Sequence, residues 1–593
     1  MWTLGISCYF HDSAAALLRD GVLVAAAEEE RFTRKKHDYG FPDNAIRFCL
    51  EYGGISGREL DHAVFFEKPF LKFDRLLKTS LQSFPRSYML FVQSMRTWLS
   101  DKLWVKSHIA RTLGLAPSRI LFSDHHLSHA ASAYYCSPFE ESAVLTFDGV
   151  GEWATTTMGS GRGRELELTR ELHFPHSLGL LYSAFTAFLG FEVNEGEYKV
   201  MGMAPYGQPR YADRVYEVLH LGPQGSFALD PRYFSFHYGI RRPYTRRFLR
   251  LFGEPRDPSM PFVTRPAAPP PNAAPASDDD HHQRNEYYAD IAASVQLVTE
   301  ELVLGLAREA HRATGSRNLC LAGGVALNSV ANDRILRETP FQGLYVQPSA
   351  GDGGGALGAA LVAWHGDPGT EQRFVMDHPY WGKAYTDEET REALDAAGVD
   401  YRHVTEETQL LDEVVQRLVD GQVIGWFQGR FEWGPRALGN RSILADPRRP
   451  DMKDIVNAKI KFREPFRPFA PSVLAEVAEE YFELGDARDA LPARFMLLVV
   501  PVREAARDTI PAVNHLGTAR PQLVHKESNP LFHELIRRFG DSTGVPVLLN
   551  TSYNVRGEPI VNSPSDALRT FAVSGLDATV LGHFIVSRKA QSR

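Results

Sequence analysis

Short apolar runs that end in turn residues recur through the N-terminal part of the chain. Residues 4–8 and 14–18 are strand-like, and Asp20-Gly21 is a strong turn signal before the apolar residues 22–24. The pattern returns at 144–147, where Asp148-Gly149 ends the apolar run before residues 154–158 resume it. Two units of strand, aspartate turn and strand predict an internally duplicated α/β fold.

Two glycine-rich turns farther along each follow a predicted strand. The strand at 319–322 runs into Gly323-Gly324 and Asn328, and the strand at 344–346 runs into GDGGG at 351–355, ahead of a helix of small residues at 356–364. A glycine turn that opens a helix brings backbone N–H groups close to a phosphate. Tight strand–helix packing explains one such turn equally well, but two turns so close together favour a nucleotide site.

Composition divides the chain into two predicted domains. The segment 265–280 is rich in Pro, Ala and Asp, which predicts a flexible insertion, and apolar residues at helical spacing over 295–306 predict a helix after it. A break near 365–369 is the best candidate boundary, so we expect domains at 1–365 and 370–593.

The bulk properties are those of an ordinary globular enzyme. The 593 residues are 44% hydrophobic and 23% charged, with a formal net charge of −8, which disfavours a general nucleic-acid binder. The four cysteines are far apart in the sequence, so neither a disulfide framework nor a thiolate zinc site is indicated. No signal peptide or transmembrane stretch is evident, and we expect a cytoplasmic protein without membrane partners.

The sharpest chemical signal is the histidine run at 125–129. His125 and His129 share one face of a predicted helix at i and i+4, so both imidazoles can reach one ion. Asp148 and Asp352, each on a turn after a strand, could complete a shell that suits Fe(II) or Mn(II) and also accepts Zn(II). Without these aspartates, a His pair on a helix surface would be the better interpretation.

His11 stands on the first turn of the chain. A histidine titrates near neutrality and can accept a proton from a hydroxyl group. A hydrogen-bonded turn histidine fits the residues equally well. The mixed charge run at 28–37 is typical of a solvated face, although one of its cations could turn inward to meet a phosphate.

Cations gather in the C-terminal half. Arg436 lies in a glycine-punctuated run, and Lys461, Arg463 and Arg467 are interleaved with prolines and aromatic residues. Guanidinium groups suit phosphate and carbamoyl oxygens, so these residues predict an anion site rather than an RNA-binding patch. The segment 548–554, with its amides and hydroxyls, is suited to orienting a polar planar group, although a simple turn explains it too.

Together these motifs resemble the carbamoyltransferase family of the nodulation protein U and tobramycin carbamoyltransferase type. The resemblance runs from end to end of the chain and rests on FHDSAAAL (10–17), EEERFTRKKH (28–37), DHHLSHAASAYY (124–135), FDGVGEW (147–153), EGEYKVMGMAPYG (195–207), LAGGVALNSVAN (321–332), GDGGGALGAAL (351–361), WGPRALGNRSILADPR (433–448), FREPFRPFAPSV (462–473), TARPQLV (518–524) and LNTSYNVRGEPIV (549–561).

The resemblance implies a duplicated actin-like N-terminal domain, of the sugar-kinase and Hsp70 type, fused to a C-terminal α/β domain similar to threonylcarbamoyl-AMP synthase. ATP and carbamoyl phosphate would form carbamoyl-AMP in the C-terminal domain. The carbamoyl group would then pass to the hydroxyl of a small-molecule acceptor, such as a sugar or secondary metabolite, at the N-terminal metal site.

The resemblance also implies roles for individual residues. His11 would be the general base and Lys36 a cation near the transferred group. The metal ligands would be His125, His129, Asp148 and Asp352. The nucleotide and carbamoyl phosphate site would comprise Arg436, Lys461, Arg467, Arg520, Asn550 and Ser552, with Gly323, Gly324 and Asn328 at the glycine turn.

The expected cofactors are Fe(II), with Mn or Zn as substitutes, and ATP with Mg as cosubstrate. The expected partners are carbamoyl phosphate, ATP and the hydroxylated acceptor, with a homodimer as an open option. Asp333 stands where the family commonly has a small residue, which puts only the nucleotide rim in question.

Three other functions account for part of the pattern. An actin-like sugar kinase explains the aspartate turns and the glycine turns but leaves His125 and His129 without a role. A tRNA threonylcarbamoyltransferase explains the metal site but needs a basic RNA-binding face. A non-enzymatic protein of actin-like fold leaves the cationic motifs unexplained.

Overall fold

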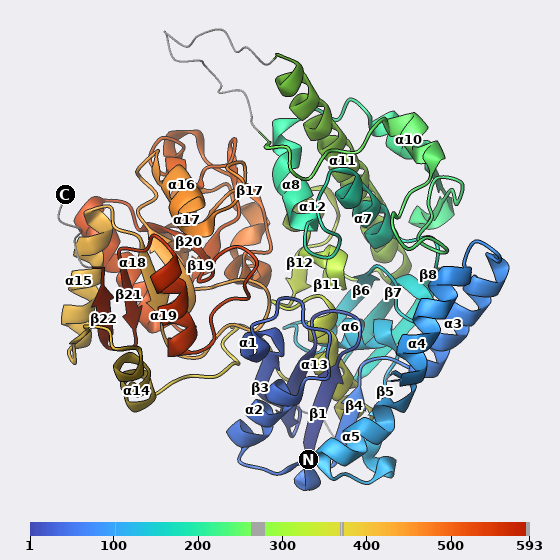
Figure 1. The fold of residues 1–593 in the computed structure, drawn as a ribbon, viewed down its shortest axis with the longest axis horizontal. Coiled ribbons are helices and arrows are strands. Elements are labelled where there is room, and N and C mark those ends of the chain that lie inside the picture. The colour runs from blue at the N-terminus through green and yellow to red at the C-terminus, as the bar shows by residue number, and fades with distance from the viewer. Residues whose placement is uncertain (101, 263–278, 368, 370–372, 589–593) are drawn as a thin grey trace.

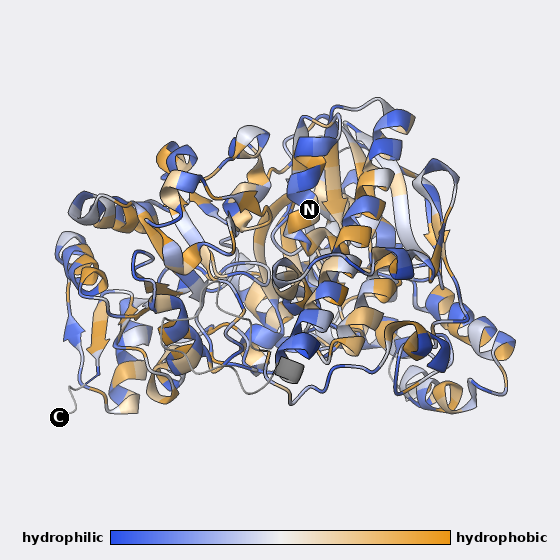
Figure 2. Cartoon of the chain, turned by 90° about the horizontal axis from the view of Figure 1, so that it is seen from above, coloured by the Kyte–Doolittle hydropathy of each residue, from blue (hydrophilic) through white to orange (hydrophobic). Residues whose placement is uncertain are grey.

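The computed structural model describes residues 1–100, 102–262, 279–367, 369 and 373–588. Three large sheets organise these residues. In Figure 1 the two N-terminal sheets lie on one side of the molecule and the C-terminal sheet lies on the other. Figure 2 shows hydrophobic residues along the strands and hydrophilic residues on the outer turns of the helices. The first two sheets are built from residues 2–346 and the C-terminal sheet from residues 402–587.

The first sheet follows directly from the N-terminal pattern. Its order is β3-β2-β1-β4-β5. Arg19 pairs with Val22, and Asp20 and Gly21 between them both have positive φ, which is the two-residue turn that matches strand twist. The elements of this part are β1 (Trp2–Ser7), β2 (Ala14–Arg19), β3 (Val22–Glu28), α1 (Glu30–Thr33), α2 (Asp43–Gly53), β4 (His62–Phe65), α3 (Pro69–Gln82), α4 (Tyr88–Ser100), α5 (Val105–Leu113), β5 (Ile120–Phe122) and α6 (His125–Tyr134).

The second sheet repeats the plan of the first. In both sheets the first three strands are antiparallel, and the fourth and fifth run parallel to the first. The second sheet has the order β12-β11-β6-β7-β8. Its elements are β6 (Glu141–Phe147), β7 (Ala154–Arg162), β8 (Glu165–His173), α7 (Leu178–Phe188), α8 (Glu197–Met203), α9 (Ala212–Tyr216), β9 (Leu219–Leu221), β10 (Phe227–Leu229), α10 (Arg246–Phe252), α11 (Asp279–Thr314), β11 (Asn318–Ala322), α12 (Ser329–Glu338), β12 (Gly343–Val346) and α13 (Asp352–Gly366). The predicted duplicated actin-like fold is confirmed.

Helices α6 and α13 pack against each other between the two repeats. Their approach is close because Gly358 faces the backbone of Ser128, where an added Cβ would overlap the carbonyl oxygen. Gly5 of β1 meets the backbone of Ala356 in the same way. One prediction needs correction here. The helix begins at Asp352 and not at 356, so the glycines at 353–355 form its first turn and allow close packing.

The C-terminal sheet is mixed, with the order β13-β22-β21-β14-β15-β20-β16-β19. Helices α15 and α18 cover one face, and α14 and α19 pack on the other. The elements are α14 (Asp387–Ala397), β13 (Arg402–His403), α15 (Glu407–Val419), β14 (Ile424–Phe427), β15 (Arg441–Ala445), α16 (Met452–Ile455), β16 (Ala470–Leu474), α17 (Ala478–Tyr481), β17 (Val500–Pro501), β18 (Thr518–Ala519), β19 (Gln522–Val524), α18 (Pro530–Thr543), β20 (Val547–Ser552), α19 (Pro564–Val573), β21 (Ala578–Leu581) and β22 (Phe584–Ser587).

The predicted insertion at 265–280 lies outside the described residues up to 278, and α11 begins at Asp279 and contains the predicted helix at 295–306. Beyond the expected boundary near 365–370, Arg373 still donates to the carbonyl of Phe139 at 2.7 Å. Within the described ranges, every helix is too short or too polar to cross a membrane.

Candidate active site

Four buried side chains from both repeats converge between α6 and α13. His125 and His129 lie on α6, Asp148 follows β6, and Asp352 is the first residue of α13. Their ligand atoms all lie within 4.8 Å of one another. Because the pair on α6 is an i, i+4 pair, both rings point to the same side, as the sequence predicts.

The separations suit a single metal ion. His125 Nε2 lies 3.1 Å from His129 Nε2 and 3.0 Å from Asp148 Oδ2, and His129 Nε2 lies 3.4 Å from Asp352 Oδ1. Ligand atoms held at about 2.1 Å from one ion at tetrahedral angles lie about 3.4 Å apart. Both carboxylate oxygens of Asp352 are buried without a hydrogen-bond partner. The residues therefore fit a divalent cation, which would satisfy these oxygens.

Residues that the sequence interpretation left without a role hold this cluster in place. Glu152 accepts a hydrogen bond from the backbone N–H of His125 at 3.0 Å, which caps the free end of α6. Glu67 lies beside the other nitrogen of the His125 ring, and Lys72 donates to Glu67 at 2.5 Å. His126 packs as a structural residue, with Nδ1 2.6 Å from Thr146 Oγ1.

The cluster is electrostatically coupled. Burial raises the pKa of Asp148, but the hydrogen bond and the charge of His125 outweigh this and hold it well below its usual range. In His125, burial lowers the pKa, but Asp352, Asp148 and Glu67 together raise it well above the ordinary value. Burial lowers the pKa of His126 to about 3, so this ring is neutral beside the cluster.

His11 lies next to the metal-ligand cluster. Its Nε2 is 3.9 Å from Asp352 Oδ2, and its Nδ1 is 3.0 Å from Asp12 Oδ2. Burial lowers its pKa, but the charge of Asp352 and the hydrogen bond with Asp12 raise it to about 9. The sequence interpretation did not foresee the effect of these carboxylates. A cation bound by Asp352 would offset part of it.

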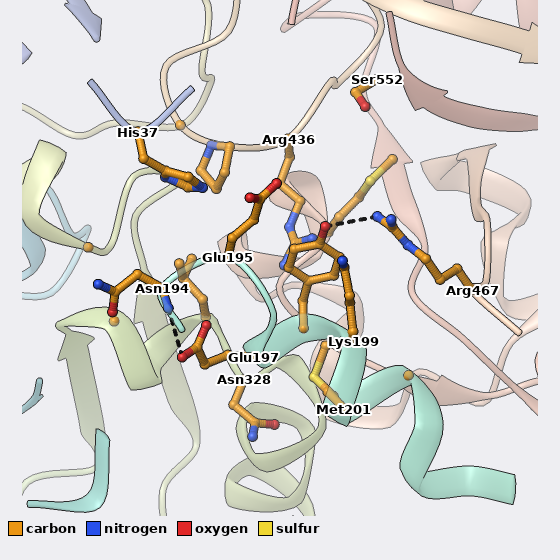
Figure 3. A pocket seen from close by; sticks show the side chains of 18 of the residues that line it. His37, Asn194, Glu195, Glu197, Lys199, Met201, Asn328, Arg436, Arg467 and Ser552 are labelled. Carbon is orange, nitrogen blue, oxygen red and sulfur yellow. Dashed lines mark hydrogen bonds between the residues drawn. The ribbon is translucent and has the colours of Figure 1, made fainter. Parts of the chain in front are cut away.

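One cavity of about 1010 Å³ joins this region to the C-terminal domain. His11 and Asp148 line its N-terminal side, together with Lys36, Gly324 and Asn328. Figure 3 shows Arg436, Arg467 and Ser552 across the same space from His37 and Asn328. The residues predicted to bind carbamoyl phosphate and nucleotide all line this cavity: Arg436, Lys461, Arg467, Arg520, Asn550 and Ser552.

The C-terminal wall carries more cations than it can pair internally. Burial lowers the pKa of Arg436 to about 10, and burial followed by the charges of neighbouring cations lowers the pKa values of Lys461 and Arg520 well below their usual ranges. The Nε atoms of Arg436 and Arg520 are buried without a partner. Repulsion and unsatisfied donors of this kind fit a polyanionic ligand.

Hydrogen bonds fix the floor of this wall. Lys461 Nζ donates to the carbonyl oxygen of Ser552 at 2.5 Å and to Asn554 Oδ1 at 2.8 Å. Asn550 donates to Ser472 Oγ at 2.9 Å, while its own Oδ1 is buried without a partner. The strand β20 therefore presents polar atoms to the cavity, rather than forming the simple turn that was the alternative.

The two glycines of the turn at 323–324 have different surroundings: one lines the cavity and the other packs against backbone. Gly324 lines the cavity, and Asn328 lines it while its side chain accepts from the backbone of Ala331 and so caps α12. Gly323 has a φ of +92° and packs its α-carbon against the backbone of Phe147, where a Cβ would overlap the carbonyl oxygen. For Gly323 the structure therefore favours the packing role.

The segment at 192–203 closes the cavity between the domains and received no role from the sequence. Glu195 forms an ion pair with Lys36 of the N-terminal charge run. Arg467 donates to the hydroxyl of Tyr198 at 3.0 Å, as the dashed line in Figure 3 marks. Lys36 therefore lines the cavity while it is paired with Glu195, a partner that only the folded chain reveals.

Comparison with known proteins finds similar families and relatives for both the N-terminal and the C-terminal part of the chain. The family described as "Carbamoyltransferase N-terminus" matches residues 2–361, and that described as "Carbamoyltransferase C-terminus" matches residues 415–588. The uncharacterized protein sll1178 of Synechocystis is 46% identical over 99% of this chain and 97% of its own length. The nodulation protein NolNO of Sinorhizobium fredii is 39% identical over 98% of this chain and 80% of its own length.

A solved structure with partial likeness is that of HypF from T. kodakarensis. It is 14% identical, covers 61% of this chain and 47% of its own, and has a TM-score of 0.31. Because that TM-score is low, the strand order alone carries our fold assignment.

Proposed function

The chain belongs to the carbamoyltransferase family and is a carbamoyltransferase enzyme, and from this we propose that it is an ATP-dependent O-carbamoyltransferase with two reaction sites in one cavity. The observation that supports this most directly is the cavity itself. Its C-terminal wall is an excess of buried cations, and its N-terminal wall reaches His11 and Asp148. A phosphorylated donor suits the first wall, and a hydroxyl acceptor suits the second.

The first reaction in this proposal forms carbamoyl-AMP at the C-terminal wall. One water cleaves carbamoyl phosphate to carbamate and phosphate, and a carbamate oxygen then attacks the α-phosphorus of ATP and displaces pyrophosphate. Arg436, Arg467 and Arg520 would bind the phosphate oxygens, because their donors face the cavity. Asn550 and Ser552 would orient the planar carbamoyl group. ATP would enter with Mg, which would supply charge neutralisation at the phosphates.

The second reaction moves the carbamoyl group to the acceptor. The acceptor oxygen forms a bond to the carbamoyl carbon, the bond to AMP breaks, and His11 Nε2 takes the hydroxyl proton. Lys36 would neutralise charge near the transferred group. The proposed ion at His125, His129, Asp148 and Asp352, Fe(II) or in its place Mn or Zn, would supply charge neutralisation when bound.

The acceptor in this proposal is a hydroxylated small molecule such as a sugar or another secondary metabolite. The proposed setting is the cytoplasm, where ATP and carbamoyl phosphate would be available. A panel of hydroxylated acceptors supplied with labelled carbamoyl phosphate would identify the acceptor by transfer of the label.

The two-site assignment predicts that the half-reactions separate by mutation. Arg436→Ala should reduce carbamoyl-phosphate-dependent pyrophosphate release by about 100-fold or more, as losing one preorganised donor commonly does. His11→Ala should leave that release largely intact and stop transfer from supplied carbamoyl-AMP. Arg449→Ala is the matched control, because Arg449 is half-exposed and pairs with Asp451 away from the cavity.

The outcome decides between one site and two. If His11→Ala stopped pyrophosphate release as completely as Arg436→Ala, the assignment of separate sites would be wrong. If wild-type protein with ATP and carbamoyl phosphate released no pyrophosphate, adenylation itself would be excluded.

A further inference from the structure

The backbone of Gly434 is held from both sides by the N-terminal domain. Its N–H donates to Glu28 Oε1 at 2.7 Å, and Arg31 Nη2 donates to its carbonyl oxygen at 2.5 Å. Gly434 has a φ of +102°, and a Cβ there would lie 2.6 Å from the carbonyl oxygen of Pro348. Both the conformation and the close contact therefore require glycine at this position.

This contact joins the two halves of the cavity at their functional residues. Gly434 stands two positions before Arg436, which faces the anion wall. The turn that it touches leads from Pro348 through Ser349 to the ligand Asp352. Ser349 Oγ lies 3.5 Å from the same Glu28 oxygen that accepts from Gly434. The Glu28 carboxylate therefore contacts Gly434, close in sequence to Arg436, and also Ser349, close in sequence to Asp352.

The neighbouring residue strengthens the connection. Trp433, which is fully buried, donates from its indole to Gln347 Oε1 at 3.2 Å. Gln347 in turn donates to the carbonyl of Ser349 at 2.8 Å, which braces the turn before Asp352. Trp433 is thus hydrogen-bonded to the turn that Gly434 closely approaches.

Charge and burial indicate positioning rather than simple adhesion. Glu28 is 6% exposed and Arg31 is 2% exposed, and Arg31 Nε lies 3.5 Å from Glu28 Oε2. A buried ion pair adds little net stability, because desolvation offsets the attraction. Its value lies in the specific geometry that it imposes, because the pair binds both the N–H and the carbonyl group of Gly434.

We propose that Glu28 and Arg31 are positioning residues that clamp Gly434 and so hold the adenylate-forming wall against the metal-ligand turn, keeping the activated carbamoyl group inside the cavity. Glu28, Arg31 and Gly434 line the cavity, but none of them is a proposed phosphate-binding residue or a proposed metal ligand. Its loss should leave each half-reaction working and separate the two. This inference rests on the proposed two-site function and adds to it the device that couples the sites.

Glu28→Gln tests the clamp, because it keeps the shape of the side chain and removes the charge that Arg31 faces. Weakening one charge-assisted hydrogen bond should reduce, by about 10- to 100-fold, the ratio of molecules in which Gly434 is held by the clamp to molecules in which it is released. Gly434→Ala is the second variant. Its added methyl group would collide with the carbonyl oxygen of Pro348 and so displace Gly434 from the clamp. Arg430→Lys is the control, because Arg430 also crosses between the domains, donating to Val24 at 3.0 Å, but lies away from Gly434 and the cavity lining.

Two quantities are measured. The first is the amount of AMP released per carbamoyl group transferred, and the second is the loss of label from the product when unlabelled carbamoyl-AMP is added to labelled carbamoyl phosphate. In wild type and Arg430→Lys the ratio should stay near one, and unlabelled carbamoyl-AMP added to labelled carbamoyl phosphate should dilute the product less than it does in the test variants. In both test variants the ratio should rise and the added adenylate should dilute the label, with pyrophosphate release and transfer from supplied adenylate each largely retained.

Two results would decide against the clamp. Unchanged ratio and dilution in both variants would overturn it. Loss of pyrophosphate release itself would also overturn it, because Glu28 would then support the anion site directly. Should Glu28→Gln fail to fold, Gly434→Ala decides alone. If wild-type protein made no carbamoyl-phosphate-dependent pyrophosphate, the proposed function would fail, and that failure is visible before any variant is compared.

Discussion

Glu67 Oε2 lies 3.7 Å from His125 Nδ1, on the edge of the ring opposite the Nε2 that faces Asp148. Burial raises the pKa of Glu67, but Lys72 and His125 lower it to about 2, so the carboxylate is charged. A carboxylate behind a ligating histidine fixes the orientation of the ring and raises its basicity. Glu67 therefore supports the proposed metal site from outside the ligand set.

Glu67→Gln should weaken metal binding by about 10- to 100-fold, the usual effect of removing such a partner. Competition with a chelator of known affinity measures this directly. Glu171→Gln is the matched control, because Glu171 pairs with His173 on the surface of β8. Equal affinity in the Glu67 variant and wild type would show that His125 needs no carboxylate support.

His129→Ala should remove bound metal and carbamoyl transfer while the chain still folds. The reason is that His129 supplies one of four converging ligand atoms and makes few other side-chain contacts. Metal analysis and circular dichroism of the purified variant check both parts. His173→Ala, at an exposed position, serves as the control. Wild-type protein that held no transition metal and kept its activity through exhaustive chelation would exclude the site.

Gly358→Ala should destabilise the protein and loosen metal binding together. The added methyl group would overlap the carbonyl oxygen of Ser128, so α13 and α6, which carry Asp352 and the two histidines, must move apart. Overpacking of this kind costs about 1–3 kcal/mol. Gly366→Ala is the control, since a Cβ at that end of α13 meets open space. Thermal unfolding with and without metal measures the effect, and matching curves for the two variants would contradict it.

Acid sensitivity should trace in part to His365. Burial, followed by the charges of Arg373 and Arg164, lowers its pKa from 6.5 to about 4, and the ring stacks on Tyr135 at 3.8 Å. The folded state therefore resists protonation that the unfolded state accepts. Stability from this group is present above pH 6.5 and is lost as pH falls towards about 4.

His365→Phe keeps the stacked ring and removes the titration. The variant and wild type should differ little in melting temperature at pH 8, and the variant should lose less as pH falls from 6.5. Parallel pH profiles for the two proteins would show that another group carries the acid sensitivity.

The sequence revealed those parts of the site that depend on local spacing. His125 and His129 form a pair because a helix repeats every few residues, and Asp148 after β6 and Asp352 at the start of α13 follow strands that a duplicated fold places in one sheet. The same signals predicted the duplication of the fold, whereas the strand order within each repeat came from the structure. The start of α13 was misplaced because three consecutive glycines favour a turn, whereas in the structure they form the first turn of α13, where Gly354 and Gly355 closely approach Ser349 and Phe66.

Contacts between distant segments could not be predicted in this way. Lys36 was expected near the transferred group, yet its partner Glu195 follows only from the position of the segment at 192–203. Glu28 and Gly434 are separated by most of the chain, so no periodicity links them. Gly323 shows a second reason why the sequence was insufficient. A glycine needed for backbone packing has the same sequence signature as a glycine that borders a ligand.

The metal-ligand cluster draws on both repeats, and this has a consequence for the synthesis of the protein. The two histidines follow the first sheet, whereas Asp148 and Asp352 belong to the second, and Asp352 is the last of the four along the chain. A nascent chain on the ribosome therefore cannot assemble the complete chelating set until β12 and the start of α13 have emerged. Metal capture would then mark the moment at which the two halves have docked, and a chain released earlier would carry no complete site.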